Sequence, residues 1–159
     1  SGTPEPSMRT LEELQPSWSK KITDVSKRFE LVLDGEGVLD KETGLVWEKT
    51  PYTGSGRLWV EAVIYAFNKN VGGRGGWRLP TVEELRSLID PTQTNPALPN
   101  GHPFTGVVPG RYWSSTSFFQ YVGTWMWSVD IITGEVVKGG NSNFYYVWCV
   151  RGGHGYDAP

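Results

Sequence analysis

The first third of the chain alternates apolar and polar residues in short runs that are separated by turn-forming residues. Residues 29–33 alternate, and Asp34-Gly35-Glu36-Gly37, which follows them, has the composition of a turn. Residues 40–44 predict a second turn, and residues 45–47 predict a short strand after it. The pattern therefore indicates a β-meander, in which neighbouring strands are antiparallel and joined by tight turns.

Two amphipathic helices are predicted next. Residues 57–70 have helical spacing, with one apolar stripe made of Leu58, Ala62, Val63, Ala66 and Phe67. The second helix starts with a capping box, in which the Thr81 hydroxyl and the Glu84 carboxylate each accept a backbone N–H of the other residue. Its buried face would be Leu85, Leu88 and Ile89.

A long proline-rich stretch, residues 91–110, has little periodicity, and we expect an irregular loop held to the core by Phe104. Strands return after it, and we expect Phe118, Phe119, Gln120 and Tyr121 to lie in a loop that connects them. On residues 124–131, alternation predicts that Trp125, Trp127, Val129 and Ile131 face inward, and that Thr124, Met126, Ser128 and Asp130 face outward. On a last strand, residues 144–151, it predicts Tyr145, Val147 and Cys149 inward, and Phe144, Tyr146 and Trp148 outward.

This order of elements, strands then two helices then strands, predicts an α+β fold with antiparallel sheets and long irregular loops. We expect one domain at residues 28–153 and a short tail at 154–159. Residues 1–27 read as a lead-in, in which residues 10–14 predict a short helix that uses Leu11 and Leu14 to dock on the domain or on a neighbouring molecule.

Composition narrows the classes of function. The chain has 159 residues and a formal net charge of -2, which argues against a general nucleic-acid binder. It has no apolar run of the roughly 18 residues that span a bilayer, so no membrane insertion is expected. Cys149 is the one cysteine, which excludes an internal disulfide. Ser1-Gly2-Thr3 is typical of a cloning remnant, and no leader pattern is visible, so the compartment stays open.

Aromatic residues are concentrated near the C-terminus. Residues 112–148 hold eleven of them and only three charged residues, Asp130, Glu135 and Lys138. Asn, Ser, Thr and Gly lie between the aromatic residues, which is the composition of a contact surface such as an antibody paratope. Aromatic residues also fill β-rich cores, so composition alone leaves both interpretations open.

Five segments in a fixed order resemble a known family. They are Arg28-Phe29, Asp40-Lys41-Glu42-Thr43-Gly44-Leu45-Val46-Trp47-Glu48, Gly76-Trp77-Arg78-Leu79-Pro80-Thr81-Val82-Glu83-Glu84-Leu85, Tyr112-Trp113-Ser114-Ser115-Thr116 and Cys149-Val150-Arg151-Gly152-Gly153. Together, from Arg28 to Gly153, they resemble the Lcl C-terminal domain family, named after a bacterial collagen-like adhesin.

The resemblance implies a C-type lectin-like fold, related to the formylglycine-generating enzyme and to the variable proteins of diversity-generating retroelements. It implies that residues 77–80 and 113–115 are framework, which pack and hydrogen-bond rather than perform chemistry. The chain departs from the family at Trp148, where members commonly carry a basic residue. An outward-facing Trp148 would add contact area to a binding surface.

The sequence favours structural over catalytic roles for the residues that could perform chemistry. The related enzyme uses a pair of cysteines, whereas Cys149 is single and on the inward side of its strand, which favours a buried, inert thiol. Ser114 and Ser115 have no evident histidine base. His102, in the proline-rich loop, and His154, in the tail, are both expected to face solvent.

Metal and polyanion sites are also weakly indicated. Asp34, Glu36 and Asp40 resemble part of a calcium loop but lack its terminal bidentate glutamate. Sulfated glycans would need clustered cations, and the cations here are scattered, at Arg111, Lys138 and Arg151 in the C-terminal third and at Lys20-Lys21 and Lys27-Arg28 in the lead-in. We therefore expect neither a metal nor a cofactor.

The sequence thus predicts a non-catalytic module that binds a protein or glycan ligand, displayed outside the cell, on its surface or on a virion. The resemblance adds the variable protein of a diversity-generating retroelement as one form of it. The alternatives are a fixed carbohydrate or glycosaminoglycan adhesin and, with much weaker support, an enzyme of the formylglycine-generating type. The sequence leaves open whether the chain forms an oligomer. The predicted contact residues are Phe118, Phe119, Gln120, Tyr121, Thr124, Met126, Ser128, Asn141, Asn143, Phe144, Tyr146 and Trp148.

Overall fold

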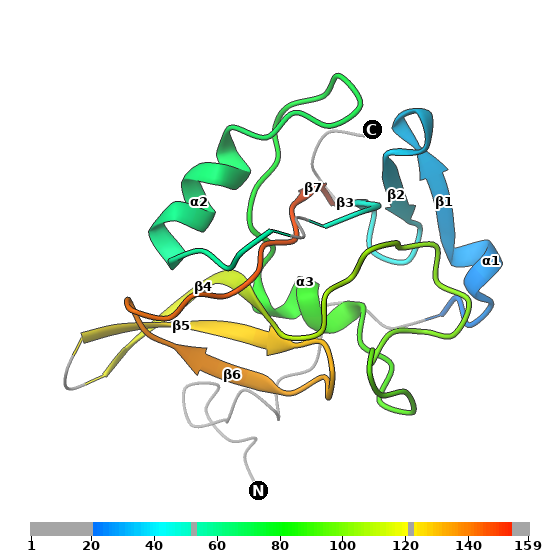
Figure 1. The fold of residues 1–159 in the computed structure, drawn as a ribbon. Helices are drawn as coiled ribbons and strands as arrows, with labels where there is room; N and C mark the ends of the chain where they lie inside the picture. The colour runs from blue at the N-terminus through cyan, green and yellow to red at the C-terminus, as the bar shows by residue number, and fades with distance from the viewer. Residues whose placement is uncertain (1–20, 52–53, 121–122, 154–159) are drawn as a thin grey trace, which may run out of the picture.

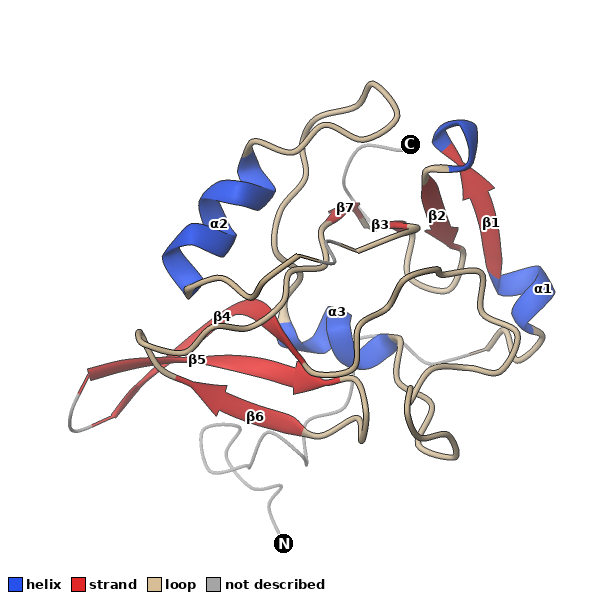
Figure 2. Ribbon diagram, in the orientation of Figure 1, coloured by secondary structure: helices blue, strands red, loops and turns tan. Residues whose placement is uncertain are grey.

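A computed structural model describes residues 21–51, 54–120 and 123–153 of the chain (Figures 1 and 2). Two small antiparallel sheets and short helices make up the fold, which confirms the α+β class. The elements in chain order are α1 (Val25–Arg28), β1 (Phe29–Val32), η3 (Leu33–Gly35), β2 (Gly37–Asp40), β3 (Leu45–Glu48), α2 (Trp59–Phe67), α3 (Val82–Ser87), β4 (Arg111–Gln120), β5 (Gly123–Asp130), β6 (Val136–Gly139) and β7 (Val150–Gly152).

The first sheet has the strand order β1-β2-β3-β7. Its first three strands are the predicted β-meander, and both predicted turns fall where expected. The last strand of the chain closes the sheet, because β7 pairs antiparallel with β3 and sets Leu45 opposite Gly152. The beginning and the end of the domain are therefore hydrogen-bonded to each other.

Two buried charged residues fix this sheet to the rest of the molecule. The Arg28 guanidinium donates to both carboxylate oxygens of Asp40, at 2.8 and 2.9 Å, and also to the Ser87 carbonyl at the end of α3. Both side chains are almost completely buried, so each charge depends on the other for its stability. Asp40 is therefore a structural residue.

The second sheet has the order β4-β5-β6, and helices cover both of its faces close to its centre. Tyr112 and Val129, paired across β4 and β5, pack in one core cluster with Leu85 of α3. The next pair, Trp113 and Ser128, lies on the opposite face, and Trp113 packs in a second cluster with Ala62 of α2. The sheet is thus buried on both sides there.

The two helices match their sequence patterns to different degrees. The capping box of α3 is confirmed: the Thr81 hydroxyl accepts the Glu84 N–H at 3.1 Å, and the Glu84 carboxylate accepts the Thr81 N–H at 2.8 Å. Leu85 and Leu88 are fully buried, as predicted, and Ile89 is half-buried.

Helix α2 is shorter than predicted, and its predicted stripe is wrong in part. Only Ala62 and Ala66 of that stripe are buried, whereas Leu58 is half-buried and the larger side chains of Val63 and Phe67 are exposed. Ala62 and Ala66 are the side of α2 that packs in the core cluster with Trp113 of β4, and the larger apolar side chains face outward.

Residues 91–110 contain no helix or strand, as predicted, and Phe104 holds this loop to the core with 5% of its surface exposed. Its ring packs edge-on against Trp148 and Phe29, with centroids 4.9 and 5.4 Å apart. Trp148 also contacts Trp47 and Tyr112, at 5.6 and 5.7 Å. Trp148 is therefore the centre of the aromatic core.

Candidate functional site

The β4–β5 hairpin is divided by an irregularity in its pairing. Strand register shifts between Trp113 and Ser117, and pairing then resumes with Ser117 opposite Met126 and ends with Gln120 opposite Gly123. Strand β6 reaches only Gly139, opposite Met126, so the end of the hairpin extends beyond it (Figure 2). We call residues 117–120 and 123–127 the distal hairpin.

Stacked aromatic rings brace one face of the distal hairpin. The Phe118 and Trp127 rings are 4.4 Å apart and nearly parallel, and both residues are half-buried. Phe118, which was predicted as a contact residue, is therefore not fully exposed to a ligand. Trp125 is the strand partner of Phe118 and lies on the same face of the hairpin. The Lys138 ammonium lies 4.8 Å from the centroid of the Trp125 ring. These contacts stiffen the end of a hairpin beside which the described residues place no third strand.

The other face presents side chains to solvent. Phe119 is 78% exposed, and its strand partner Thr124 is exposed as well. Gln120, which alternation puts on the face of Phe118, is also exposed at the end of the strand. Their predicted exposure is confirmed, but the prediction that residues 118–120 form a loop is wrong, because β4 continues to Gln120. Tyr121, also predicted at this site, lies outside the described residues.

Residues 140–144 form a loop beside the distal hairpin (Figure 1). Gly140 allows this approach, since a Cβ there would lie 2.9 Å from the Trp125 ring. The Asn143 side-chain oxygen accepts the Gly140 N–H at 2.7 Å and fixes the turn. Asn141, Asn143 and Phe144 are exposed as predicted, Phe144 to 64%. We call the exposed set Phe119, Gln120, Thr124, Asn141, Asn143 and Phe144 the display surface.

Two predicted contact residues on β5 are wrong. Met126 is 2% exposed and packs in the cluster with Trp113, and Ser128 is fully buried with its hydroxyl donating to the Val137 carbonyl at 2.7 Å. Alternation identifies an outward face only where one side of a sheet meets solvent. Here the second face is covered by the core around α2, so neither side chain is available to a ligand.

Trp148 and Tyr146 are also wrong as exposed contacts. Trp148 is fully buried and its indole N–H donates to the Glu48 carbonyl at 2.9 Å, while Tyr146 is half-buried against Tyr112. Residues 144–149 are not the predicted regular strand, since they form only isolated bridges at Tyr145 and Tyr146. Three consecutive residues, 147–149, are therefore buried, which no alternating pattern describes.

Cys149 is buried, as predicted, beside a polar network that the sequence did not reveal. The Glu48 carboxylate accepts the Cys149 N–H at 2.7 Å and pairs with the Lys69 ammonium at 3.1 Å, and that ammonium donates to the Tyr65 hydroxyl. Burial, and after it the charge of Glu48, raises the pKa of the Cys149 thiol well above its usual range. The thiol is therefore protonated at neutral pH and a poor nucleophile.

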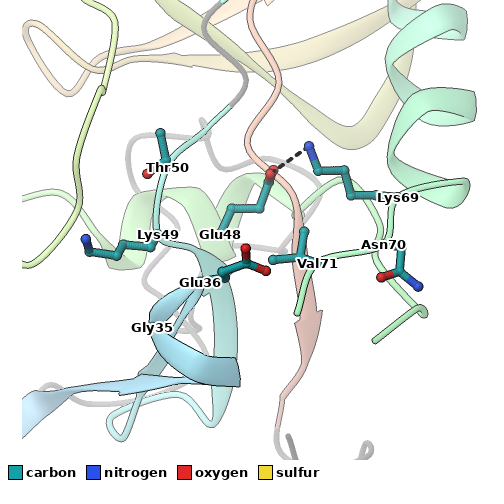
Figure 3. A pocket seen from close by; sticks show the side chains of 8 residues that line it. All are labelled: Gly35, Glu36, Glu48, Lys49, Thr50, Lys69, Asn70 and Val71. Atoms are coloured by element: carbon teal, nitrogen blue, oxygen red, sulfur yellow. Dashed lines mark ion pairs between the residues drawn. The ribbon is translucent and has the colours of Figure 1, made fainter. Parts of the chain in front are cut away.

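A pocket of about 320 Å³ opens over this network (Figure 3). Glu48 and Lys69 point toward each other in it, joined by their ion pair. Burial lowers the pKa of Lys69, but the Tyr65 hydrogen bond and the Glu48 charge outweigh it and raise that pKa above the usual value. Both charged groups are engaged within the protein, so this pocket fits a structural role.

Two residues of the predicted partial calcium loop are engaged separately within the described part of the chain. The Glu36 carboxylate accepts the Gly72 N–H, whereas Asp40 is held in its buried ion pair with Arg28. Over the described ranges, no three His, Cys, Asp or Glu side chains are grouped so as to hold a metal ion. No helix in this part of the chain has the length and apolarity needed to cross a membrane.

His102 is half-buried, not solvent-facing as predicted, because its ring stacks on Phe104 and its Nδ1 accepts the Phe104 N–H at 3.2 Å. Burial lowers the pKa of His102. His154 lies outside the described residues.

The framework residues behave as the resemblance implied, with one exception. Trp77 and Leu79 are buried, and the Arg78 guanidinium makes two hydrogen bonds to the Glu84 carboxylate. The Ser114 hydroxyl is buried and donates to the Trp127 carbonyl at 2.6 Å. Ser115 is the exception, since its side chain is exposed and its backbone N–H makes the contact, with the Pro80 carbonyl.

The fold and the display surface define an α+β domain with a rigid framework and one solvent-facing set of aromatic and amide side chains. Comparison with protein families finds the Lcl C-terminal domain over residues 36–151, and the chain belongs to that family. A comparison with curated protein sequences found no match. The matched range begins just before β2 and ends at Arg151 in β7.

Proposed function

We propose that the chain is a non-catalytic ligand-binding module on a C-type lectin-like scaffold, displayed outside the cell or on a virion. Membership of the Lcl C-terminal domain family and the pair of antiparallel sheets support the scaffold. The distal hairpin and the loop beside it supply the binding surface. A protein or glycan is the class of ligand that such a surface fits.

One observation carries this proposal: Phe119 and Phe144 expose 78% and 64% of their surface, although the framework buries aromatic side chains efficiently. Rigid aromatic side chains give a large contact area at a small cost in conformational entropy. Gln120 follows Phe119 and Asn141 and Asn143 precede Phe144 in the chain, and their exposed amides offer donors and acceptors that set specificity. The braced distal hairpin holds Phe119 in place before the ligand arrives.

A diversified form of this function makes a residue-level prediction. If the chain is a retroelement variable protein, amino-acid changes concentrate at the positions of the display surface other than Asn143, whose side chain fixes the turn at Gly140. Substitution at these exposed positions requires no repacking of the core. Met126, Ser128 and Trp148, which the core needs, stay constant. Sequencing the locus from many isolates tests this, and variation at the buried positions, or none at the exposed ones, contradicts it.

A binding assay tests the general proposal. The full chain is screened on glycan and protein arrays, and the best ligand is then measured against Phe119→Ala/Phe144→Ala. We expect at least a tenfold loss of affinity, since exposed aromatic anchors dominate such surfaces. Leu31→Ala is the matched control, because Leu31 is a 52% exposed apolar residue on β1, away from the display surface. Equal binding by both variants overturns the proposal.

The same array experiment distinguishes a fixed adhesin from a module that binds through the display surface. Binding to sulfated glycans that falls steeply with salt would favour an adhesin that uses cations rather than the display surface.

An enzyme of the formylglycine-generating type needs a reactive thiol. We expect native Cys149 to react with thiol reagents far more slowly than the unfolded chain does, and Cys149→Ser to keep ligand binding.

A further inference from the structure

The outer edge of β4, the side of the strand that faces away from β5, is covered by other parts of the chain near the core. The Trp113 N–H donates to the Tyr146 carbonyl at 3.0 Å, and the Ser115 N–H donates to the Pro80 carbonyl at 2.8 Å. Neither acceptor belongs to β5, so both N–H groups point outward from the edge of the β4-β5-β6 sheet. This half of the edge is therefore satisfied within the domain.

The outer edge continues along the distal hairpin without such a cover. In an antiparallel pair, residues that exchange hydrogen bonds with the opposite residue alternate with residues whose N–H and C=O point away from it. Trp113 and its partner Ser128 are of the second kind, since the Trp113 N–H goes to Tyr146. The partners of Ser117 and Phe119 lie two and four residues before Ser128 on β5, so the N–H and C=O of these two residues also point away from β5. Both residues are exposed, and in the described part of the chain no backbone hydrogen bond reaches this side of them.

This part of the outer edge lacks the usual protection against pairing. Exposed edge strands commonly carry a charged residue or a proline, which discourages another strand from adding to them. The outer strands β1 and β6 carry Glu30 and Lys138. Residues 117–120 are Ser-Phe-Phe-Gln, with neither a charge nor a proline, and aromatic residues favour extended structure. The edge is therefore open to an added strand.

We propose that an extended segment of a partner protein adds to the sheet along the outer edge of residues 117–120. This inference rests on the proposed function and names the class of its ligand, a polypeptide rather than a glycan. The outward N–H and C=O groups of Ser117 and Phe119 recur about 7 Å apart, which is the spacing at which the backbone of an added strand presents its own. Glycan hydroxyls can each donate or accept, so they do not select such an alternating row. The exposed Phe119 ring lies beside the row and packs against a side chain of the ligand, and the lack of charge fits an uncharged segment.

Selection from a library of short linear peptides of random sequence, with the full chain as target, tests this inference. The best peptide is synthesised, and its Kd is measured against two variants of one residue. Ser117→Pro removes the outward N–H but no hydrogen bond to β5, so we expect binding to weaken by about tenfold or more. Ser117→Ala is the matched control, because it removes the hydroxyl and keeps the N–H, and its Kd should stay within about twofold of the wild type. Circular dichroism checks that both variants are folded.

A second measurement uses the wild-type chain and therefore does not depend on how Ser117→Pro folds. Each amide of the selected peptide is methylated in turn. Because only every second amide of an added strand faces the sheet, we expect the loss of affinity to alternate along the peptide. A loss that does not alternate, or Ser117→Pro that binds as well as Ser117→Ala, overturns the inference.

The glycan and protein arrays separate this inference from the proposed function. If the library yields no peptide but a glycan binds, and its binding falls in Phe119→Ala/Phe144→Ala, the added strand is wrong and the proposed function stands. If neither the library nor the arrays yield a ligand that depends on these two residues, both are wrong.

Discussion

The two halves of the β4–β5 hairpin differ sharply in burial. In the half nearest the core, Tyr112, Trp113 and Ser114 are fully buried, and each donates a side-chain hydrogen bond to a backbone carbonyl. In the distal hairpin, Phe119 and Gln120 of the same strand face solvent. The register shift between Trp113 and Ser117 separates the two. One strand therefore belongs to both the framework and the display surface, with the register shift between the two parts.

The largest effect that the comparison predicts is on the framework side, at Trp148. We expect Trp148→Ala to lower the free energy of unfolding by about 3–5 kcal/mol, because it empties the centre of the aromatic core and leaves the Glu48 carbonyl without its indole donor. Urea denaturation measures this. Phe144→Ala, in the exposed loop four residues earlier, is the control, and a similar loss in both variants would contradict the comparison.

A smaller framework effect is expected at Ser114. Ser114→Ala removes a buried hydroxyl that donates to the Trp127 carbonyl and accepts the Thr116 N–H, so we expect a loss of about 1–3 kcal/mol. Its neighbour supplies the control: Ser115→Ala changes an exposed side chain and should stay within about 0.5 kcal/mol. Thermal unfolding of the two variants, run side by side, decides whether burial rather than residue type sets the cost.

The framework also predicts a pH dependence, at His102. Its pKa is lowered by burial, so between that value and the ordinary 6.5 the unfolded chain binds more protons than the folded one. The contribution of His102 to stability is complete above pH 6.5 and is lost as pH falls through the folded pKa. Melting temperatures measured from about pH 8 to pH 5 should therefore fall more for the wild type than for His102→Gln. Parallel curves of melting temperature against pH for the two proteins would show that His102 does not cause the pH dependence.

The smallest effect on stability is expected on the display side. Phe119→Ala should change the free energy of unfolding by less than about 0.5 kcal/mol, because 78% of the side chain is already in water. Ligand binding by the same variant should fall. At Ser114, by contrast, the expected effect of the substitution is a loss of stability. A destabilisation of more than about 1 kcal/mol would show that Phe119 belongs to the framework.

Local sequence signals predicted the parts of the fold that depend on neighbouring residues. The β-meander follows from its turn residues, and α3 from the Thr81–Glu84 capping box. The exposure of Phe119, Gln120 and Thr124, and of Asn141, Asn143 and Phe144, was also predicted correctly.

Positions that depend on distant packing were not predictable in this way. Met126 and Ser128 are buried because α2, from another part of the chain, covers that face of β5. Trp148 is buried because residues 147–149 leave the strand pattern and pass through the core, where the main chain meets Glu48, about 100 residues earlier. No alternation within one segment contains that information.

The pairing of β7 with β3 has a consequence for how the chain is made. Synthesis begins at the N-terminus, so β3 leaves the ribosome about 100 residues before its partner. Until residues 148–152 follow, the first sheet has an open edge at β3 and the aromatic core lacks its central ring. We therefore expect nascent chains that end before Trp148 to remain unfolded and sensitive to protease, and folding to complete only after almost the whole domain has emerged.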